Sequence, residues 1–122
     1  MNLSRKALVV SLVLGAFLFG TFAWAYATFT KTFTDTYKVA KDSNLLKAKC
    51  ALCHAEATKN FKKLNPYGAD LQKAMQKEKA KELTAKILAS VEKLDSDKDK
   101  AANIAEIKAN TLPGDPKSCP KK

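Results

Sequence analysis

Two thiols and an imidazole stand together near the middle of this 122-residue chain, in the run Cys50-Ala51-Leu52-Cys53-His54. Two cysteines three residues apart, followed directly by a histidine, are the pattern at which a c-type haem is attached. On a helix, residues i and i+3 share a face, so both thiols can reach the two vinyl groups on one edge of a porphyrin. The imidazole of His54, the only histidine in the sequence, can then ligate the iron. The sequence therefore predicts one covalent haem c, bound through Cys50, Cys53 and His54.

Three different uses of this cysteine pair fit the sequence less well. A thioredoxin-like redox pair requires a βαβ context, and the chain shows no such pattern. A structural zinc site requires four ligands, and Cys119 is the only further cysteine or histidine. A disulfide between Cys50 and Cys53 would leave His54 without a role. Cys119 lies in the lysine-rich tail, where we expect an exposed thiol, with a disulfide-linked dimer as the alternative.

The sequence does not single out one residue as the second axial ligand of the iron. Met75 is the only methionine besides Met1, and histidine–methionine ligation suits electron transfer. Met75 also shares an expected helical stripe with Tyr67 and Leu71, so a packed core methionine is an equally good interpretation. A five-coordinate iron is also compatible with the sequence, as is ligation by a lysine, a tyrosine or the Cys119 thiolate.

An acidic segment at residues 95–106 has the spacing of a calcium loop of the EF-hand type. Its candidate side-chain ligands, at loop positions 1, 3, 5, 9 and 12, are Asp95, Asp97, Asp99, Asn103 and Glu106. Ala101, at position 7, would contribute its backbone carbonyl. Lys100 stands where such loops carry glycine, and it weakens the expected binding through both charge and backbone strain. The alternative is an acidic loop that favours the N-terminus of the next helix.

The first 27 residues have the layout of an export signal. Arg5 and Lys6 are followed by an uncharged run over residues 7–27, which ends in small-residue cleavage patterns. The run is also long enough to cross a bilayer, so the segment is predicted to be either a signal peptide or an N-terminal membrane anchor. In both cases the positive residues stay inside, and everything after residue 27 is periplasmic or otherwise extracytoplasmic.

The net charge of the chain and its choice of basic residues indicate which kinds of partner to expect. The chain has 22 Lys plus Arg against 12 Asp plus Glu, a net charge of +10. Arg5 is the only arginine, so the exported part lacks the arginine forks with which proteins read nucleic acids, and no nucleic-acid partner is expected. Lysines suit docking to redox proteins with acidic surfaces, although a merely solvated face is the plain alternative. The lysines near the cysteine pair are Lys47, Lys49, Lys59, Lys62 and Lys63.

Hydrophobic periodicity predicts a series of short helices. Phe29, Phe33 and Tyr37 recur every fourth residue and predict a helix over 28–42, although alternating threonines also allow a strand there. Ser43 is a candidate N-cap for a helix over 45–54, and residues 55–65 are expected to be irregular.

Further helices are expected in the second half of the chain. Asn65-Pro66 is a typical helix opening, with a cap and then proline in the first turn. Apolar residues predict another helix over 83–94 and a short one over 104–108. The predicted class is all-α, a small cytochrome c-like bundle of short helices around one covalent haem. Residues 28–118 would form the domain, and 119–122 a basic tail.

A family resemblance runs through these segments. It is carried by Lys49 to His54, by Lys63-Leu64-Asn65-Pro66-Tyr67-Gly68-Ala69-Asp70-Leu71, by residues 94–107 and by residues 111–116. Together they resemble small bacterial monohaem c-type cytochromes with a calcium loop of the thrombospondin type 3 or dockerin kind. The resemblance covers about residues 45–118. It implies electron transfer in the periplasm or at the outer surface, and calcium bound by the acidic segment.

These observations predict a carrier rather than an enzyme. The expected function is the transfer of single electrons between redox proteins outside the cytoplasm. One alternative is a haem protein with an open iron site, acting as a small-ligand sensor or a weak peroxidase. Another is a calcium-stabilised docking module in which the haem is mainly a fold element.

Overall fold

The computed structural model describes residues 27–56 and 59–120, so the predicted signal or anchor segment lies, apart from Ala27, outside the described residues. Residues 27–37 are helical. The elements that follow are α2 (Asn44–Lys47), the 3-10 helix η1 (Lys49–Leu52), β1 (His54–Glu56), β2 (Asn60–Leu64), α3 (Pro66–Lys77), α4 (Ala85–Val91) and α5 (Asn103–Lys108). Within the described ranges, the helices are all too short or too polar to span a bilayer.

The expectation of an all-α fold is wrong, because β1 and β2 pair as a two-stranded antiparallel sheet. His54 pairs with Leu64 and Glu56 with Asn60, with an irregularity between the two pairs. These strands fall in the segment expected to be irregular. The side chains of β2 are exposed except for the half-buried Leu64, so the strand lacks the alternation of buried and exposed residues that would reveal it. The protein remains small and mostly helical.

The helix predicted over 45–54 is also corrected, because the structure divides it into α2 and η1. Lys49 has a φ of 51°, a left-handed conformation that an α-helix cannot continue through. Left-handed residues also follow the helix over 27–37 and α3, at Lys38 and Lys79. A lysine at such a position gives no signal in the sequence, where glycine would be the usual mark of a helix end.

Side-chain caps begin three of the helices, two of them as predicted. Ser43 Oγ accepts a hydrogen bond from the Leu46 N–H at 3.1 Å, and α2 follows it. Asn65 Oδ1 accepts one from the Gly68 N–H at 2.8 Å, and Pro66 opens α3. Thr84 caps α4 in the same way.

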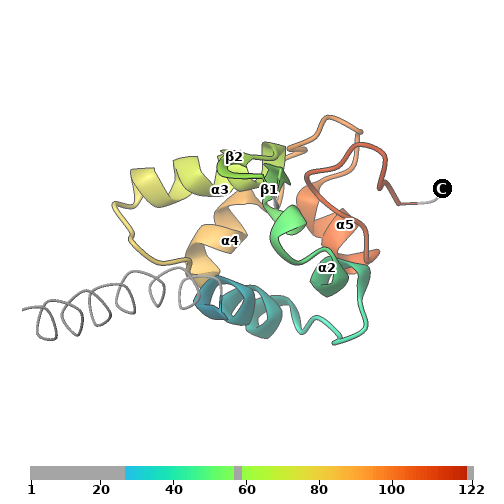
Figure 1. Ribbon diagram of the computed structural model, residues 1–122, viewed down its shortest axis with the longest axis horizontal. Helices are drawn as coiled ribbons and strands as arrows, with labels where there is room; N and C mark the ends of the chain where they lie inside the picture. Colours follow the sequence, from blue (N-terminus) through green and yellow to red (C-terminus); the bar gives the residue numbers. More distant parts are fainter. Residues whose placement is uncertain (1–26, 57–58, 121–122) are drawn as a thin grey trace, which may run out of the picture.

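The hydrophobic core lies where α3 packs against α4 (Figure 1). Tyr67 and Leu88 are its most buried members, at 0% exposed. Phe33 joins it from the helix over 27–37, while Phe29 is 37% exposed and faces away, so the expected stripe is confirmed only in part. Cys53 is half-buried against this same core, which brings the cysteine pair next to the best-packed region of the protein.

Candidate functional site

The cysteine pair lies on η1 and the residue that caps it. A 3-10 helix has three residues per turn, so residues i and i+3 eclipse, and Cys50 and Cys53 fall on one side. Both thiols are free and half-buried. Burial, and secondarily the neighbouring Cys50, raises the pKa of the Cys53 thiol to about 12. The structure therefore places two reduced thiols on one side of this turn.

His54 follows directly as the first residue of β1. Its Nδ1 atom is buried and has no hydrogen-bond partner among the described residues. The edge of its ring lies against Phe61 of β2, with ring centroids 5.9 Å apart and the planes at 80°. A buried imidazole nitrogen without a partner is chemically suited to a metal, because a histidine in a packed structure normally uses both nitrogens. The residues present thus fit a covalently attached haem.

A zinc ion fits this group poorly. In residues 27–56 and 59–120, only Asp95, Asp97 and Asp99 form a group of three His, Cys, Asp or Glu side chains whose ligand atoms converge on one point. The two thiols and the imidazole therefore do not converge as tetrahedral zinc ligands would. Cys119 is exposed in the tail, as predicted.

Met75 lies in the second half of α3. It is half-buried against the core, as the packing interpretation predicts. The residue of α3 that contacts the Cys53 backbone is Gly68. Met75 lies seven residues after Gly68, which places it about 10 Å farther along the helix axis. Ligation of iron by Met75 stays a prediction.

One buried tyrosine beside Cys53 was not singled out from the sequence as a site residue. The Tyr67 hydroxyl is buried without a hydrogen-bond partner among the described residues. Burial raises the pKa of Tyr67, and this residue is close enough to Cys53 for their charges to interact. In the sequence Tyr67 counts only as an apolar member of a helical stripe, since nothing local indicates an unpaired hydroxyl. Its hydroxyl is a polar atom that a group beside Cys53 can engage.

The acidic segment folds into a tight loop. Ligand atoms of Asp95, Asp97 and Asp99 lie within 4.8 Å of one another. The two carboxylate oxygens of Asp95 accept hydrogen bonds from the N–H groups of Asp99, at 3.1 Å, and Lys100, at 2.9 Å. Asp99 accepts one from the Ala101 N–H at 2.8 Å. Lys100 has a φ of 79°, so it takes the left-handed conformation that glycine usually provides at this position.

Glu106, on α5, strengthens the case for a cation at this loop. It is 0% exposed, and neither carboxylate oxygen has a hydrogen-bond partner among the described residues. Burial first, then the negative charges of Asp97, Asp99 and Asp95, raises the pKa of Glu106 to about 8. Burial and the neighbouring aspartates raise the pKa of Asp97 to about 6. A buried carboxylate without a donor is costly, and a hard cation such as Ca²⁺ prefers this set of oxygens.

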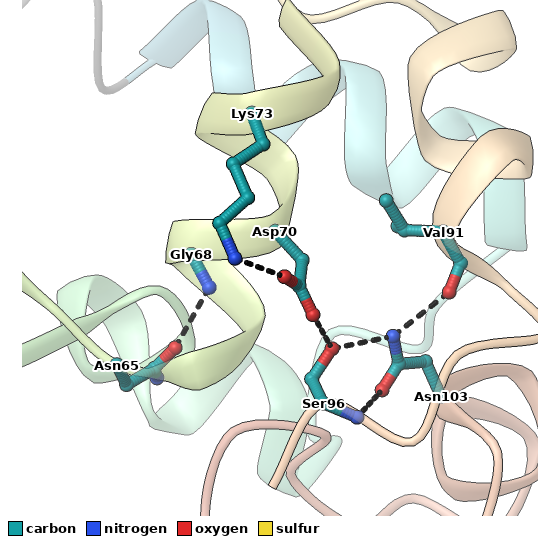
Figure 2. Close-up of polar contacts among 7 residues, drawn as sticks. All are labelled: Asn65, Gly68, Asp70, Lys73, Val91, Ser96 and Asn103. Carbon is teal, nitrogen blue, oxygen red and sulfur yellow. Dashed lines mark hydrogen bonds and ion pairs between the residues drawn. The ribbon is translucent and has the colours of Figure 1, made fainter.

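Asn103 does not join these carboxylates, although its loop position predicts a ligand. Its Nδ2 donates to the Val91 carbonyl and to Ser96 Oγ, both at 2.8 Å. Its Oδ1 accepts from the Ser96 N–H at 3.2 Å (Figure 2). The Asn103 side chain therefore closes the loop by hydrogen bonds, and its oxygen is not directed at the cation site. This role depends on Val91 and Ser96, which only the fold brings to it.

Both candidate sites contact the first two turns of α3. Gly68 lies against the Cys53 backbone, and Asp70 accepts a hydrogen bond from Ser96 Oγ at 2.8 Å (Figure 2). Residues 50–54, the cysteine segment, and the acidic loop are thus both held by α3. No protein-family model, curated protein or solved structure matches this chain.

Proposed function

We propose that this chain is an exported c-type cytochrome that carries single electrons between redox proteins outside the cytoplasm. The observation that carries the proposal is the group formed by Cys50, Cys53 and His54. It combines two free thiols on one side of a 3-10 turn with an adjacent imidazole whose Nδ1 has no partner among the described residues. When bound, a haem supplies one-electron redox chemistry at its iron.

The chain's own residues would share the work of holding that group. Cys50 and Cys53 would attach it covalently, and His54 would give the iron a nitrogen ligand. Met75 would supply a second ligand to the iron. The chain would set the ligation, the burial and the access to solvent, so it would act as a carrier and not as an enzyme.

The sheet beside His54 would form the docking surface for acidic partners. Phe61 is 60% exposed, and its ring contacts that of His54. Lys59 and Lys62 are exposed on the same hairpin, and Lys63 pairs with Glu56. Positive charge at this place would steer an acidic redox partner toward the haem ligand, with an effect that weakens as salt rises.

We propose calcium as the occupant of the acidic loop, with a structural role. Four carboxyl groups, one of them fully buried and unpaired, gather there, and among the described residues no cationic side chain is bonded to them. This observation also favours the second candidate function, a calcium-stabilised docking module in which the haem is mainly a fold element. That alternative predicts a melting temperature that depends strongly on calcium, and no electron exchange with donor proteins.

The first experiment measures the mass of the purified protein. The chain is co-expressed with a haem-ligation apparatus, and the purified product is expected to carry the mass of one haem that stays bound in acid-acetone. Cys50→Ala and Cys53→Ala should each lose a thioether bond. Cys119→Ala, the matched control at the exposed cysteine, should behave like the parent chain. A parent protein without the added mass would contradict the proposal.

The second experiment addresses Met75. Visible and near-infrared spectra of the haem-loaded protein are expected to be low-spin, and Met75→Leu, which keeps the volume but removes the sulfur, should convert them to high-spin. Unchanged spectra in this variant would assign the position to another residue. A high-spin parent that binds carbon monoxide when reduced would instead support the open-iron alternative.

A further inference from the structure

Ser96 lies between Asp95 and Asp97 in the acidic loop and joins that loop to α3. Its hydroxyl donates a hydrogen bond to Asp70 Oδ2 at 2.8 Å, across 26 positions of the chain (Figure 2). A hydrogen bond to an ionised carboxylate is roughly twice as strong as one between neutral groups. The loop position between two candidate calcium ligands is therefore fastened firmly to a helix from another part of the chain.

The loop side of Ser96 is fixed as well. Its Oγ accepts a hydrogen bond from Asn103 Nδ2 at 2.8 Å, and its backbone N–H donates to Asn103 Oδ1 at 3.2 Å. The backbone N–H of Asn103 donates in turn to the Leu94 carbonyl at 2.7 Å, which brings the two ends of the acidic loop together. A shift of Ser96 therefore disturbs the bonds that hold the loop closed.

The helix that receives the serine bond also supports the cysteine segment. A Cβ on Gly68 would lie 2.0 Å from the Cys53 carbonyl oxygen, so no side chain fits between α3 and this segment. Asp70 follows Gly68 by two residues, which is about 3 Å along the helix axis and a little more than half a turn around it. The first two turns of α3 therefore contact the cysteine segment on one side and the acidic loop on the other.

The acidic loop depends most on this support when no cation is bound. Its carboxyl groups repel one another, and Glu106 is buried beside them without a hydrogen-bond partner among the described residues. A cation holds such a loop closed, whereas the empty loop opens more readily, and Ser96 leaves Asp70 when it opens. We propose that the Ser96–Asp70 bond couples calcium binding in the acidic loop to the stability of the first turns of α3, and thereby to the packing of the cysteine segment. This inference rests on the proposed calcium site.

Coupling of this kind is reciprocal, so an intact bond should strengthen calcium binding by the same factor by which calcium stabilises α3. Asp70→Ala removes the acceptor of the bond. Asp70→Asn removes the charge but keeps a carbonyl oxygen to which Ser96 can donate. Lys73→Ala is the matched control, because it removes the ion pair between Lys73 and Asp70 and leaves the serine bond in place.

The first readout is the calcium Kd, measured by titration calorimetry on the full chain as purified and treated with chelator. Asp70→Ala is expected to raise the Kd by about 5-fold, whereas Asp70→Asn and Lys73→Ala should stay near the parent value. A Kd in Asp70→Ala equal to that of the parent would overturn the proposal. An equal rise in Asp70→Asn would overturn it too, because the charge of Asp70 and not its bond would then act on the cation.

The second readout is amide hydrogen exchange at the start of α3, where the Gly68 N–H is bonded to Asn65 Oδ1. Saturating calcium is expected to slow exchange of this amide by about 5-fold or more in the parent, and by much less in Asp70→Ala. Amides of the helix over 27–37 are the internal control, because a gain in global stability alone would slow both helices alike.

The two readouts separate this inference from the calcium site on which it rests. A parent chain that gives no calcium binding in calorimetry would overturn the calcium site, and the coupling with it. A parent chain that binds calcium, but in which exchange at Gly68 slows no more than in the helix over 27–37, would overturn the coupling alone. Both measurements are independent of haem attachment.

Discussion

The cysteine segment, residues 50–54, and the acidic loop are both preorganised, but by opposite means. The segment around Cys50 and Cys53 is neutral, and its carbonyls are bound by a residue from another part of the chain, Asn65. The acidic loop folds mainly on itself, with the Asp95 carboxylate accepting bonds from residues four and five positions later. One site is held by long-range hydrogen bonds, and the other by local turns.

The two sites also differ in what they lack. The segment of Cys50 and Cys53 has three carbonyls bonded by Asn65, while the His54 Nδ1 and the nearby Tyr67 hydroxyl are unpaired among the described residues. The acidic loop brings like charges together and leaves Glu106 buried among them. A substitution in another segment that contacts the cysteine segment should therefore disturb the first site most. A change in calcium concentration or pH should disturb the second, because the repulsion among its carboxyl groups responds to cations and protons.

The largest effect is expected from Gly68→Ala. The new Cβ would overlap the Cys53 carbonyl, so we expect a loss of about 3 kcal/mol in the free energy of unfolding, at the upper end for overpacking. Urea unfolding of the apoprotein measures it. Gln72→Ala, at an exposed position of the same helix, is the control and should change little. A stable Gly68→Ala protein would show that the cysteine segment is not held by close contact with α3.

Calcium should have the next largest effect, confined to the acidic loop. Calcium at about 100 times its Kd is expected to raise the free energy of unfolding by about 2.7 kcal/mol. Glu106→Gln should lose most of this gain, yet be more stable than the parent in chelator, because it replaces a buried carboxyl group whose ionised form is costly there. The exposed Glu82→Gln is the control for charge alone. An equal calcium response in parent and Glu106→Gln would remove Glu106 from the site.

Replacement of Lys100 should stabilise the loop and tighten calcium binding by separate routes. The lysine has a φ of 79° in the folded loop, so Lys100→Gly should gain about 1 to 2 kcal/mol in the free energy of unfolding in chelator, the strain of a left-handed non-glycine residue. Loss of the positive charge should lower the calcium Kd of Lys100→Gly and Lys100→Gln alike, measured by titration calorimetry. Lys100→Gln keeps the strain, so it should not gain stability in chelator. Equal free energies of unfolding in the two variants would contradict strain at this position.

The stability of the calcium-free protein should also depend on pH. In the folded state the pKa of Asp97 is raised to about 6 and that of Glu106 to about 8, so the folded protein keeps protons that the unfolded chain releases earlier. The stability from this loop is present below about pH 4 and is lost as pH rises to about 8. Urea unfolding in chelator at about pH 5, 7 and 9 tests the window. In Glu106→Gln the free energy of unfolding should change over a narrower range of pH. A parent whose free energy of unfolding does not change with pH would contradict the raised pKa values of these carboxyl groups.

The sequence predicted the elements that local signals determine. Ser43 and Asn65 are caps where their types and neighbours indicated, because a cap acts within three residues of itself. The spacing of Asp95, Asp97 and Asp99 likewise predicted a cluster that the structure brings together. The two strands were missed because exposed side chains carry no periodic signal. The division of the predicted helix at Lys49 was missed because a lysine gives no sequence signal for a left-handed backbone conformation.

By itself, the amino-acid sequence determined which groups can do chemistry and how far apart along the chain they lie. It placed two thiols, one imidazole and a series of carboxylates at spacings that suit a haem and a hard cation. Only the tertiary structure decided how those groups are held. It gave Asn65 three carbonyl partners more than ten residues away, turned Asn103 inward to Ser96, and buried Glu106 without a partner among the described residues. The physical reason is that spacing is a property of the covalent chain, whereas burial and hydrogen-bond partnership depend on segments that meet only after folding.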